Sequence, residues 1–151
     1  MLYGWTREMS GAGRQVVSLT LDRVHDLPDP CASCIFWELD PALAAASIAR
    51  GDPALDKESW LSAALLEWGS VGQIAYVDGV PAGYVTYAPP YIVPRAAAFP
   101  TAPVSADAVI LMTARVVPEF SGQGLGRVLS QGAARDVMRR GVGASEAFGY
   151  R

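Results

Sequence analysis

Hydrophobic and polar residues alternate between Val16 and Arg23, near the start of the chain. Val17, Leu19 and Leu21 would lie on one face of an extended segment, and polar side chains separate them. A period of two residues is typical of a strand with one buried face. The pattern therefore predicts a first strand over Val16–Arg23.

The periodicity becomes helical between residues 40 and 69. Asp-Pro pairs at positions 40–41 and 52–53 each combine a capping side chain with a proline that suits the first turn of a helix. Gly51 and Gly69 stand where helices would end. We therefore expect two or three helical pieces, the last of them with a core-facing stripe of Leu61, Ala64, Leu65 and Trp68.

Two β-rich runs, Gln73–Val77 and Pro81–Tyr87, flank the pair Asp78-Gly79. Asp-Gly is favoured in the type I′ turn that joins two antiparallel strands tightly. This is the strongest hairpin signal in the chain, and it predicts the second and third strands.

A connection of roughly twenty residues follows the hairpin, which is longer than compact domains usually need. It contains five prolines, which favour a stiff, extended backbone. Two interpretations remain open: a flap on the substrate side, or a cover over one edge of the sheet. The prolines are Pro89, Pro90, Pro94, Pro100 and Pro103.

An apolar run from Val109 to Val117 predicts a fourth strand, and Pro118 ends it because proline cannot donate to a ladder. After a glycine-rich turn, apolar residues recur at helical spacing until Gly141, which occupies the expected C′ position. Ala144–Tyr150 predicts a fifth strand. The expected apolar face of the helix consists of Leu125, Val128, Leu129, Ala133 and Val137.

The length and the N-terminus restrict the class of protein. A chain of 151 residues suits one domain, because it can bury about two thirds of its unfolded surface. No segment approaches the roughly 18 consecutive apolar residues of a membrane span, so no membrane partner is expected. Residues 1–13 lack the apolar stretch of a secretory signal. We expect a flexible arm over 1–13, one domain over 14–151 and a cytoplasmic protein.

The net charge of −3 is unevenly distributed. Residues 1–106 carry six Lys+Arg and eleven Asp+Glu, whereas residues 107–151 carry six Arg and four acids. A basic C-terminal part suits phosphates, and an acidic N-terminal part suits a cationic ligand. Nucleic acid is not an expected partner, because the chain has one lysine and no basic run.

The cysteines do not form a recognisable framework. Cys31, Cys34 and the single histidine His25 are too few for a disulfide scaffold or a complete four-ligand zinc site. Redox and metal dithiols usually open a helix that follows a strand, whereas prolines precede this CxxC pair, and Phe36 and Trp37 follow it. We therefore expect two buried cytosolic thiols and no metal.

The turn before the last helix contains alternating glycines at 122, 124 and 126. Glycine clears side chains from a helix N-terminus, so that successive backbone N–H groups can point at one anion. The unpaired amides and the helix dipole favour a pyrophosphate. Two other phosphate motifs fit less well, because Leu129 interrupts a GxGxxG pattern and no lysine follows the loop as in a P-loop.

The strand, the proline and the loop Ser121–Gly126 together resemble motif A of the GNAT acyl-CoA-dependent N-acetyltransferases. That motif consists of Arg or Gln, any two residues, Gly, any residue, and then Gly or Ala. The order of elements is similar over roughly Val16–Arg151. The resemblance implies a GNAT-like α/β fold, in which helices flank a mixed, mainly antiparallel sheet, and it implies acetyl-CoA as the cosubstrate.

The resemblance also implies which residues bind CoA. Main-chain groups of the glycine loop would surround the pyrophosphate, and the backbone of residues 114–116 would pair with the pantetheine arm. Ser121 stands where the motif has Arg or Gln, so one side-chain contribution is absent. The cofactor-binding residues implied in this way are Ala114, Arg115, Val116, Ser121, Gly122, Gln123, Gly124, Leu125, Gly126 and Arg127.

The implied reaction is direct attack of a neutral amine on the thioester. The acceptor would be a small-molecule or peptide amine that is cationic when free, so a carboxylate should help to remove its proton. Glu38, beside two aromatic residues, and Asp107, which precedes the fourth strand, are the candidates. No residue is assigned as the general acid. The alternative is a non-catalytic acyl-CoA sensor or assembly module of the same fold.

The GNAT pattern would add another helix and two strands after Tyr150, where this sequence has only Arg151. The expectation is that the chain is a fragment or that a homodimer supplies the missing cover. In either case CoA binding should survive better than turnover.

Overall fold

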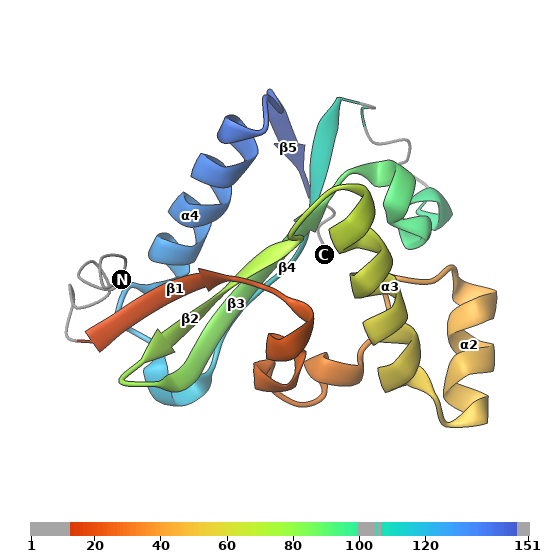
Figure 1. Cartoon of the computed structure of the whole chain (residues 1–151), viewed down its shortest axis with the longest axis horizontal. Coiled ribbons are helices and arrows are strands. Elements are labelled where there is room, and N and C mark those ends of the chain that lie inside the picture. Colours follow the sequence, from red (N-terminus) through yellow and green to blue (C-terminus); the bar gives the residue numbers. More distant parts are fainter. Residues whose placement is uncertain (1–12, 100–104, 106, 148–151) are drawn as a thin grey trace.

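A computed structural model of the chain describes residues 13–99, 105 and 107–147. In this part of the chain, strands form one sheet in the order β1-β2-β3-β4-β5 (Figure 1). Each of the first four strands is antiparallel to its neighbour, and β5 is parallel to β4. The mixed, mainly antiparallel sheet predicted from the sequence is therefore confirmed. The strands are Arg14–Ser18 (β1), Gly72–Val77 (β2), Val80–Ala88 (β3), Ala108–Val116 (β4) and Ala144–Glu146 (β5).

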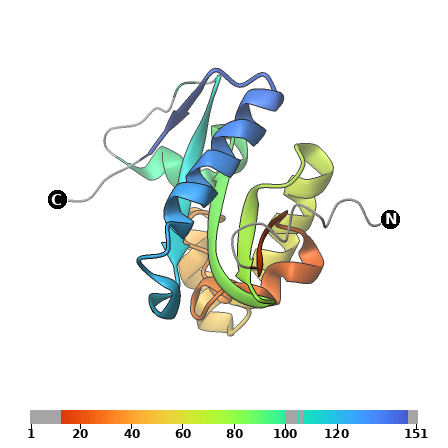
Figure 2. The same ribbon diagram turned by 90° about the vertical axis from the view of Figure 1, so that its left-hand side faces the viewer.

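Helices cover both faces of the sheet. Helix α4 lies on one face, and α3 with several short 3-10 helices lies on the other, with α2 outside α3 (Figures 1 and 2). The α-helices are Pro41–Arg50 (α2), Pro53–Glu67 (α3) and Leu125–Arg139 (α4). The 3-10 helices are Leu21–Asp26 (η2), Cys31–Ser33 (η3), Pro90–Ile92 (η4), Pro94–Ala98 (η5) and Pro118–Phe120 (η6).

The helices begin where the sequence predicts, although the Asp52 side chain, expected to cap α3, makes no cap hydrogen bond. The Asp40 carboxylate accepts a hydrogen bond from the Leu43 N–H at 2.9 Å, as expected of an N-cap. Gly51 ends α2 in the left-handed conformation, with φ 81°. The hairpin turn is also confirmed, because Asp78 and Gly79 both have positive φ, as a type I′ turn requires.

The first strand is shorter than its alternating pattern predicts. Pairing with β2 ends where the Leu19 N–H donates to the Gly72 carbonyl, and the 3-10 helix η2 follows. The Thr20 hydroxyl donates to the Asp22 carboxylate at 2.5 Å, a local bond that competes with an extended backbone. As a result Leu21, expected on the buried face, is 40% exposed.

Two further differences concern the C-terminal part. Val128, expected in the apolar face of α4, is half-buried, whereas Gly132 lies in the buried face. The fifth strand covers Ala144–Glu146, and Ala147 lies outside it. The remainder of its predicted range, 148–150, lies outside the described residues, as does most of the predicted arm over 1–13.

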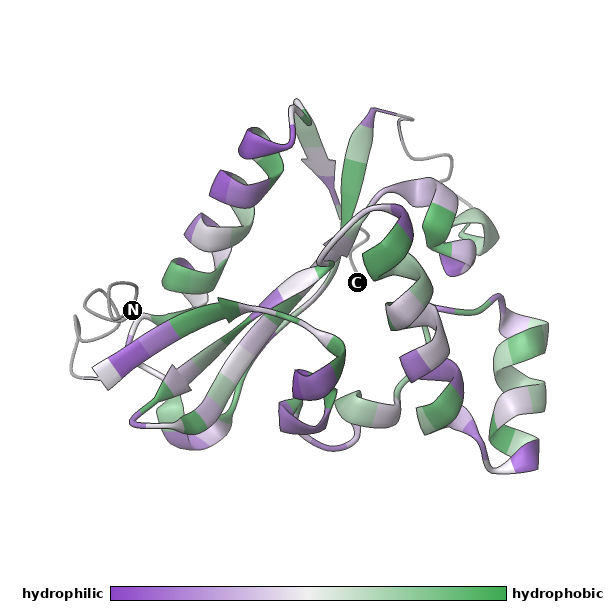
Figure 3. Ribbon diagram, viewed as in Figure 1, coloured by the Kyte–Doolittle hydropathy of each residue, from purple (hydrophilic) through white to green (hydrophobic). Residues whose placement is uncertain are grey.

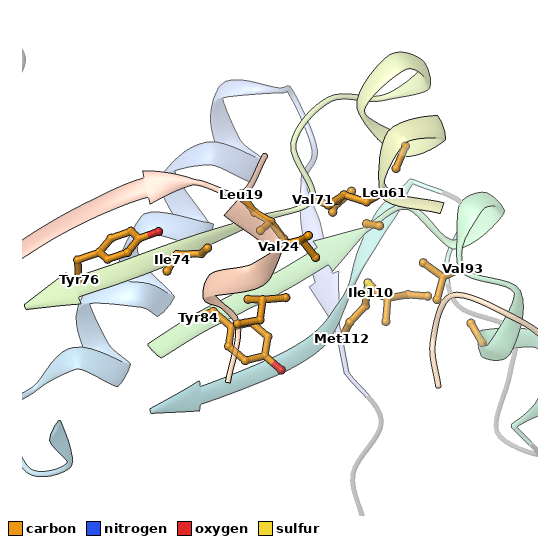
Figure 4. Packing of buried hydrophobic residues seen from close by; sticks show 14 residues of the cluster. Leu19, Val24, Leu61, Val71, Ile74, Tyr76, Tyr84, Val93, Ile110 and Met112 are labelled. Atoms are coloured by element: carbon orange, nitrogen blue, oxygen red, sulfur yellow. The ribbon is translucent and has the colours of Figure 1, made fainter. Parts of the chain in front are cut away.

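The core consists of two clusters, one on each face of the sheet. The first contains Ile74, Tyr84, Ile110 and Met112 from the strands and Leu61 from α3 (Figure 4). The second lies under α4, which carries both hydrophobic and hydrophilic residues (Figure 3) and buries its apolar face against the sheet. The sheet therefore holds α4, and the loop that precedes it, in a fixed position beside β4.

Candidate active site

Strand β4 presents part of its backbone to an edge that no described strand covers, called here the open edge of β4. The Val117 N–H donates to the Ala82 carbonyl at 2.8 Å, and the β3–β4 register pairs Arg115 with Tyr84. Because hydrogen-bonded and non-bonded pairs alternate in an antiparallel ladder, Arg115 bonds to β3, while Ala114 and Val116 direct their N–H and C=O groups away from it. Among the described residues, β5 pairs with β4 only at positions 108–110.

The glycine loop follows directly and starts α4. Gly122 and Gly124 have φ near 80°, and Gly124 is the N-cap residue of the helix. A Cβ atom built on Gly122, Gly124 or Gly126 would meet no described atom within 4 Å. The loop is thus open to solvent at the N-terminus of a helix of 15 residues, where unpaired amides point outward.

Side chains in the loop are placed unequally for ligand binding. Leu125 is buried in the core at 2% exposure, so only its backbone is available, whereas Gln123 and Arg127 are exposed. The Ser121 hydroxyl donates to the Pro118 carbonyl at 2.9 Å and stabilises the turn before the helix.

Arg14 is a neighbour of this loop that the sequence did not indicate. Its guanidinium, from the first residue of β1, donates to the Gln123 carbonyl. The loop and the start of β1 lie at the same end of the sheet (Figure 1). The two residues are 109 positions apart in the chain, so no local sequence pattern predicts their contact.

The two carboxylates predicted for proton transfer have different surroundings. Glu38 is 5% exposed, and its carboxylate contacts the Lys57 ammonium at 2.8 Å. Lys57 also donates to the Cys34 carbonyl at 2.8 Å. Asp107 is exposed and precedes β4, so the strand separates it from Val116 by roughly 30 Å. A catalytic role for either residue stays a prediction.

A polar cluster lies beside β4 on the face away from α4. The Arg115 Nη1 group donates to the Cys31 sulfur at 3.3 Å. Both cysteines are free thiols, but Cys31 is half-buried and Cys34 is exposed, so the expectation that both are buried is wrong. Burial raises the pKa of Tyr84, a hydrogen bond with Cys31 raises it further, and the Arg115 charge opposes both effects. Within the described ranges, no three His, Cys, Asp or Glu side chains gather where they could hold a metal ion.

The described part of the proline-rich connection packs onto the segment that follows the cysteines. The Arg95 guanidinium lies 4.1 Å from the centre of the Phe36 ring, and Phe99 stacks on Trp37 with ring centres 5.6 Å apart. Beside these rings, residues of η3, α2 and Arg95 line an open, mainly apolar groove of about 580 Å³. A flap on the substrate side stays a prediction, since residues 100–104 and 106 lie outside the described chain.

A second cavity, of about 310 Å³, lies between α4 and the strands β4 and β5. Its lining is mainly apolar and includes Leu111, Ala133 and Val137.

None of the described helices is both long and apolar enough to cross a bilayer.

Comparison with models of known protein families finds no match, and no curated protein matches the sequence. Solved structures, by contrast, match over most of the chain. The PaiA N-acetyltransferase from Thermoplasma acidophilum, in complex with coenzyme A, is 11% identical, with a TM-score of 0.60, and the match covers 91% of this chain and 80% of that one.

Two further structures are similar. The aminoglycoside N-acetyltransferase AAC(6')-Iy in complex with CoA has a TM-score of 0.60 at 16% identity, with 94% of this chain and 80% of that chain covered. A GCN5-related N-acetyltransferase from Ralstonia eutropha JMP134 has a TM-score of 0.54 at 17% identity, with 91% and 84% covered. The chain therefore has the GNAT-like fold expected from its sequence.

Proposed function

We propose that this protein is an N-acetyltransferase that transfers the acetyl group of acetyl-CoA to an amine. The observation that carries the proposal is the continuity of two backbone features. Strand β4 directs the N–H and C=O groups of Ala114 and Val116 to an open edge, and it leads through η6 into the glycine turn at the N-terminus of α4. Coenzyme A has an extended pantetheine arm with amide groups, followed by a pyrophosphate. The arm can pair with β4, and the pyrophosphate can bind at the N-terminus of α4.

Different residues bind the two parts of coenzyme A. The amides of the loop from Gly122 to Gly126 bind the pyrophosphate, and Arg127 adds a positive charge at the surface. Ala114 and Val116 pair with the pantetheine arm through their backbone. Coenzyme A bound to the PaiA and AAC(6')-Iy structures supports this class of ligand.

The chemistry follows from orientation. The amine nitrogen attacks the thioester carbonyl, a C–N bond forms, the C–S bond breaks, and the thiolate leaves and takes up a proton. A backbone N–H on the open edge of β4 stabilises the oxyanion, and the fixed strand holds the carbonyl in the direction of attack. The amine must also lose a proton, to a carboxylate or to water. The Lys57 ammonium contacts the carboxylate of Glu38, one of the two candidates for this role.

Ligand-induced stabilisation tests the cofactor site. CoA or acetyl-CoA should raise the Tm, because a ligand that binds only the native state stabilises it. Gly124→Val should lose this shift while its far-UV spectrum stays folded, because the side chain blocks the approach of the pyrophosphate. If Gly124→Val responds to CoA as the unchanged protein does, the cofactor lies elsewhere.

Gly51→Val is a matched control for this experiment. Gly51 has φ 81° and Gly124 has φ 79°, and neither would bring a Cβ atom within 4 Å of a described atom. Both substitutions carry the same backbone strain, about 1–3 kcal/mol. Only Gly124→Val should change the response to CoA.

The ion pair of Glu38 and the position of Asp107 favour a second candidate, a sensor that binds acyl-CoA without transferring it. Release of free CoA thiol separates the two functions. An enzyme releases thiol with at least one amine from a panel of aminoglycosides, polyamines, amino acids and peptides, and a sensor binds CoA with none of them turning over.

A further inference from the structure

The side chain of Arg115 contacts a sulfur atom and not a carboxylate. It is half-buried, and within the described ranges its side chain donates one hydrogen bond, to the Cys31 sulfur at 3.3 Å. No carboxylate of the described residues lies within 4.0 Å of it. By contrast, Lys57 and Arg140 each contact a carboxylate, at 2.8 and 3.0 Å.

A neutral thiol is a poor partner for a guanidinium. Sulfur accepts hydrogen bonds weakly, and an arginine offers five N–H donors in a planar fork that matches a carboxylate. Partial burial removes water from such a group without replacing the anion that would compensate it. The position of Arg115 therefore suits an anion that the described residues do not supply.

The location of Arg115 indicates which anion this is. Its backbone lies between Ala114 and Val116, the two residues that face the open edge of β4. Its side chain lies with Cys31 and Tyr84 on the α3 side of the sheet, opposite to α4 and its N-terminal amides. The guanidinium thus lies beside the proposed acyl position and across the sheet from the helix that would hold the pyrophosphate.

We propose that Arg115 binds a carboxylate of the acceptor, so that the substrate is an amino acid or a similar amine with a nearby carboxylate. The inference rests on the proposed acetyltransferase function and names the substrate class of that site. Because Arg115 lies between the two residues that face the open edge of β4, a carboxylate bound to its guanidinium would lie close to the amine that attacks the thioester. A free amino acid is also cationic at its amine, as the acidic N-terminal part of the chain favours.

Paired acceptors test this inference directly. The CoA-thiol release with alanine, leucine and phenylalanine is compared with that of the corresponding amino-acid amides. The free acids should have the lower KM, and Arg115→Gln should raise the KM of the acids by about 10- to 100-fold while it leaves the amides and the KM of acetyl-CoA unchanged. Arg115→Lys should recover part of the loss, because it keeps the charge but not the fork.

Three further variants make the test specific. Arg135→Gln, on the exposed face of α4, removes the same charge and should leave the preference for acids intact. Cys31→Asp places a carboxylate where Arg115 now contacts sulfur, and it should abolish the preference, whereas Cys31→Ser should retain it.

The outcomes separate this inference from the proposed function. Turnover of amides as efficiently as acids, or a rise in the KM of acetyl-CoA alone in Arg115→Gln, overturns the role of Arg115 and leaves the acetyltransferase intact. If no amine turns over, calorimetric titration of the acids and the amides into the CoA-loaded protein measures their binding and tests the role of Arg115. Binding of acids that Arg115→Gln loses supports the inference, and equal or absent binding contradicts it.

Discussion

Gly126 is a residue for which the fold itself gives no reason. It lies in the first turn of α4, has no positive φ, and would bring an added Cβ atom near no described atom. Glycine in a helix costs about 1 kcal/mol relative to alanine. The close approach of a ligand to the backbone explains such a residue, as we propose for the pyrophosphate.

Gly126→Ala should therefore separate stability from binding. The Tm without ligand should rise or stay unchanged, because alanine favours the helix by up to about 1 kcal/mol, while the affinity for CoA should fall. Thermal unfolding with and without CoA measures both effects. Gln131→Ala, on the exposed part of the same helix, is the control and should leave CoA binding unchanged. Unchanged CoA affinity in Gly126→Ala would falsify the role of this glycine.

Glu38 should act on stability through Lys57. Both side chains are largely buried, at 6% and 13% exposure, and removal of one partner leaves the other charge unpaired. Glu38→Gln should lower the free energy of unfolding by about 3 kcal/mol, and the double variant with Lys57→Met should recover much of this loss. Chemical denaturation of the unchanged protein, the two single variants and the double variant gives the interaction free energy between the two side chains. A loss of turnover in Glu38→Gln at unchanged stability would instead identify the catalytic base.

The residue scale also shows how far the sequence could lead. The glycine loop was recognisable, because its residues are neighbours in the chain and their spacing reflects one local turn. Arg14 was not, since its contact with Gln123 depends on how β1 lies against the loop. Arg115 was expected to contribute only its backbone, and its environment became visible once η3 placed Cys31 against it.

At the scale of elements, the alternation of the β4 backbone gives a further prediction. The Thr113 and Arg115 amides bond to β3 and should exchange slowly with solvent even without ligand. The Ala114 and Val116 amides point to the open edge, and they should become protected only when CoA is added. Amide hydrogen exchange followed by NMR resolves the four positions. Equal protection of all four amides without CoA, or no change at Ala114 and Val116 with it, would show that pantetheine does not pair with this strand.

The strands and helices were predictable wherever their signals were local. The Asp-Pro starts of α2 and α3 and the Asp-Gly turn depend on a few neighbouring residues, and they appear where expected. The prediction that the first strand continues beyond Ser18 was wrong. A local hydrogen bond of Thr20 precedes a 3-10 helix that buries Val24 instead of Leu21. The hydrophobic pattern does not show whether this local hydrogen bond or continued pairing with β2 is more stable.

At the scale of the whole molecule, one polar network joins the layers. The Asp136 carboxylate of α4 accepts a hydrogen bond from the Tyr87 hydroxyl of β3 at 2.7 Å and contacts Arg140 at 3.0 Å. Arg140 donates to the Ser70 carbonyl at 2.8 Å, and its guanidinium lies 4.0 Å from the centre of the Trp68 ring at the end of α3. The network thus fixes the C-terminal half of α4 to the sheet and to the helix layer on the other face.

This network should make part of the stability depend on pH. Burial acts to raise the pKa of Asp136, but hydrogen bonds from Tyr87 and Arg140 and the nearby positive charges outweigh it and hold the pKa below its usual value. A carboxylate with a depressed pKa in the folded state stabilises the fold above its unfolded pKa, about 3.9, and this contribution is lost as the pH falls through the folded pKa.

Asp136→Asn should therefore be less stable than the unchanged protein at pH 7, by about 1.5–3 kcal/mol, because asparagine keeps the shape but not the charge. The difference should persist down to about pH 4 and shrink below it, as Asp136 of the unchanged protein takes up its proton. Urea unfolding of both proteins from pH 7 to about pH 2.5 measures the difference, and comparison of the pair removes the effect of the other carboxylates. A difference that stays constant through this range would mean that Asp136 stabilises the fold by its shape and packing, not through its charge.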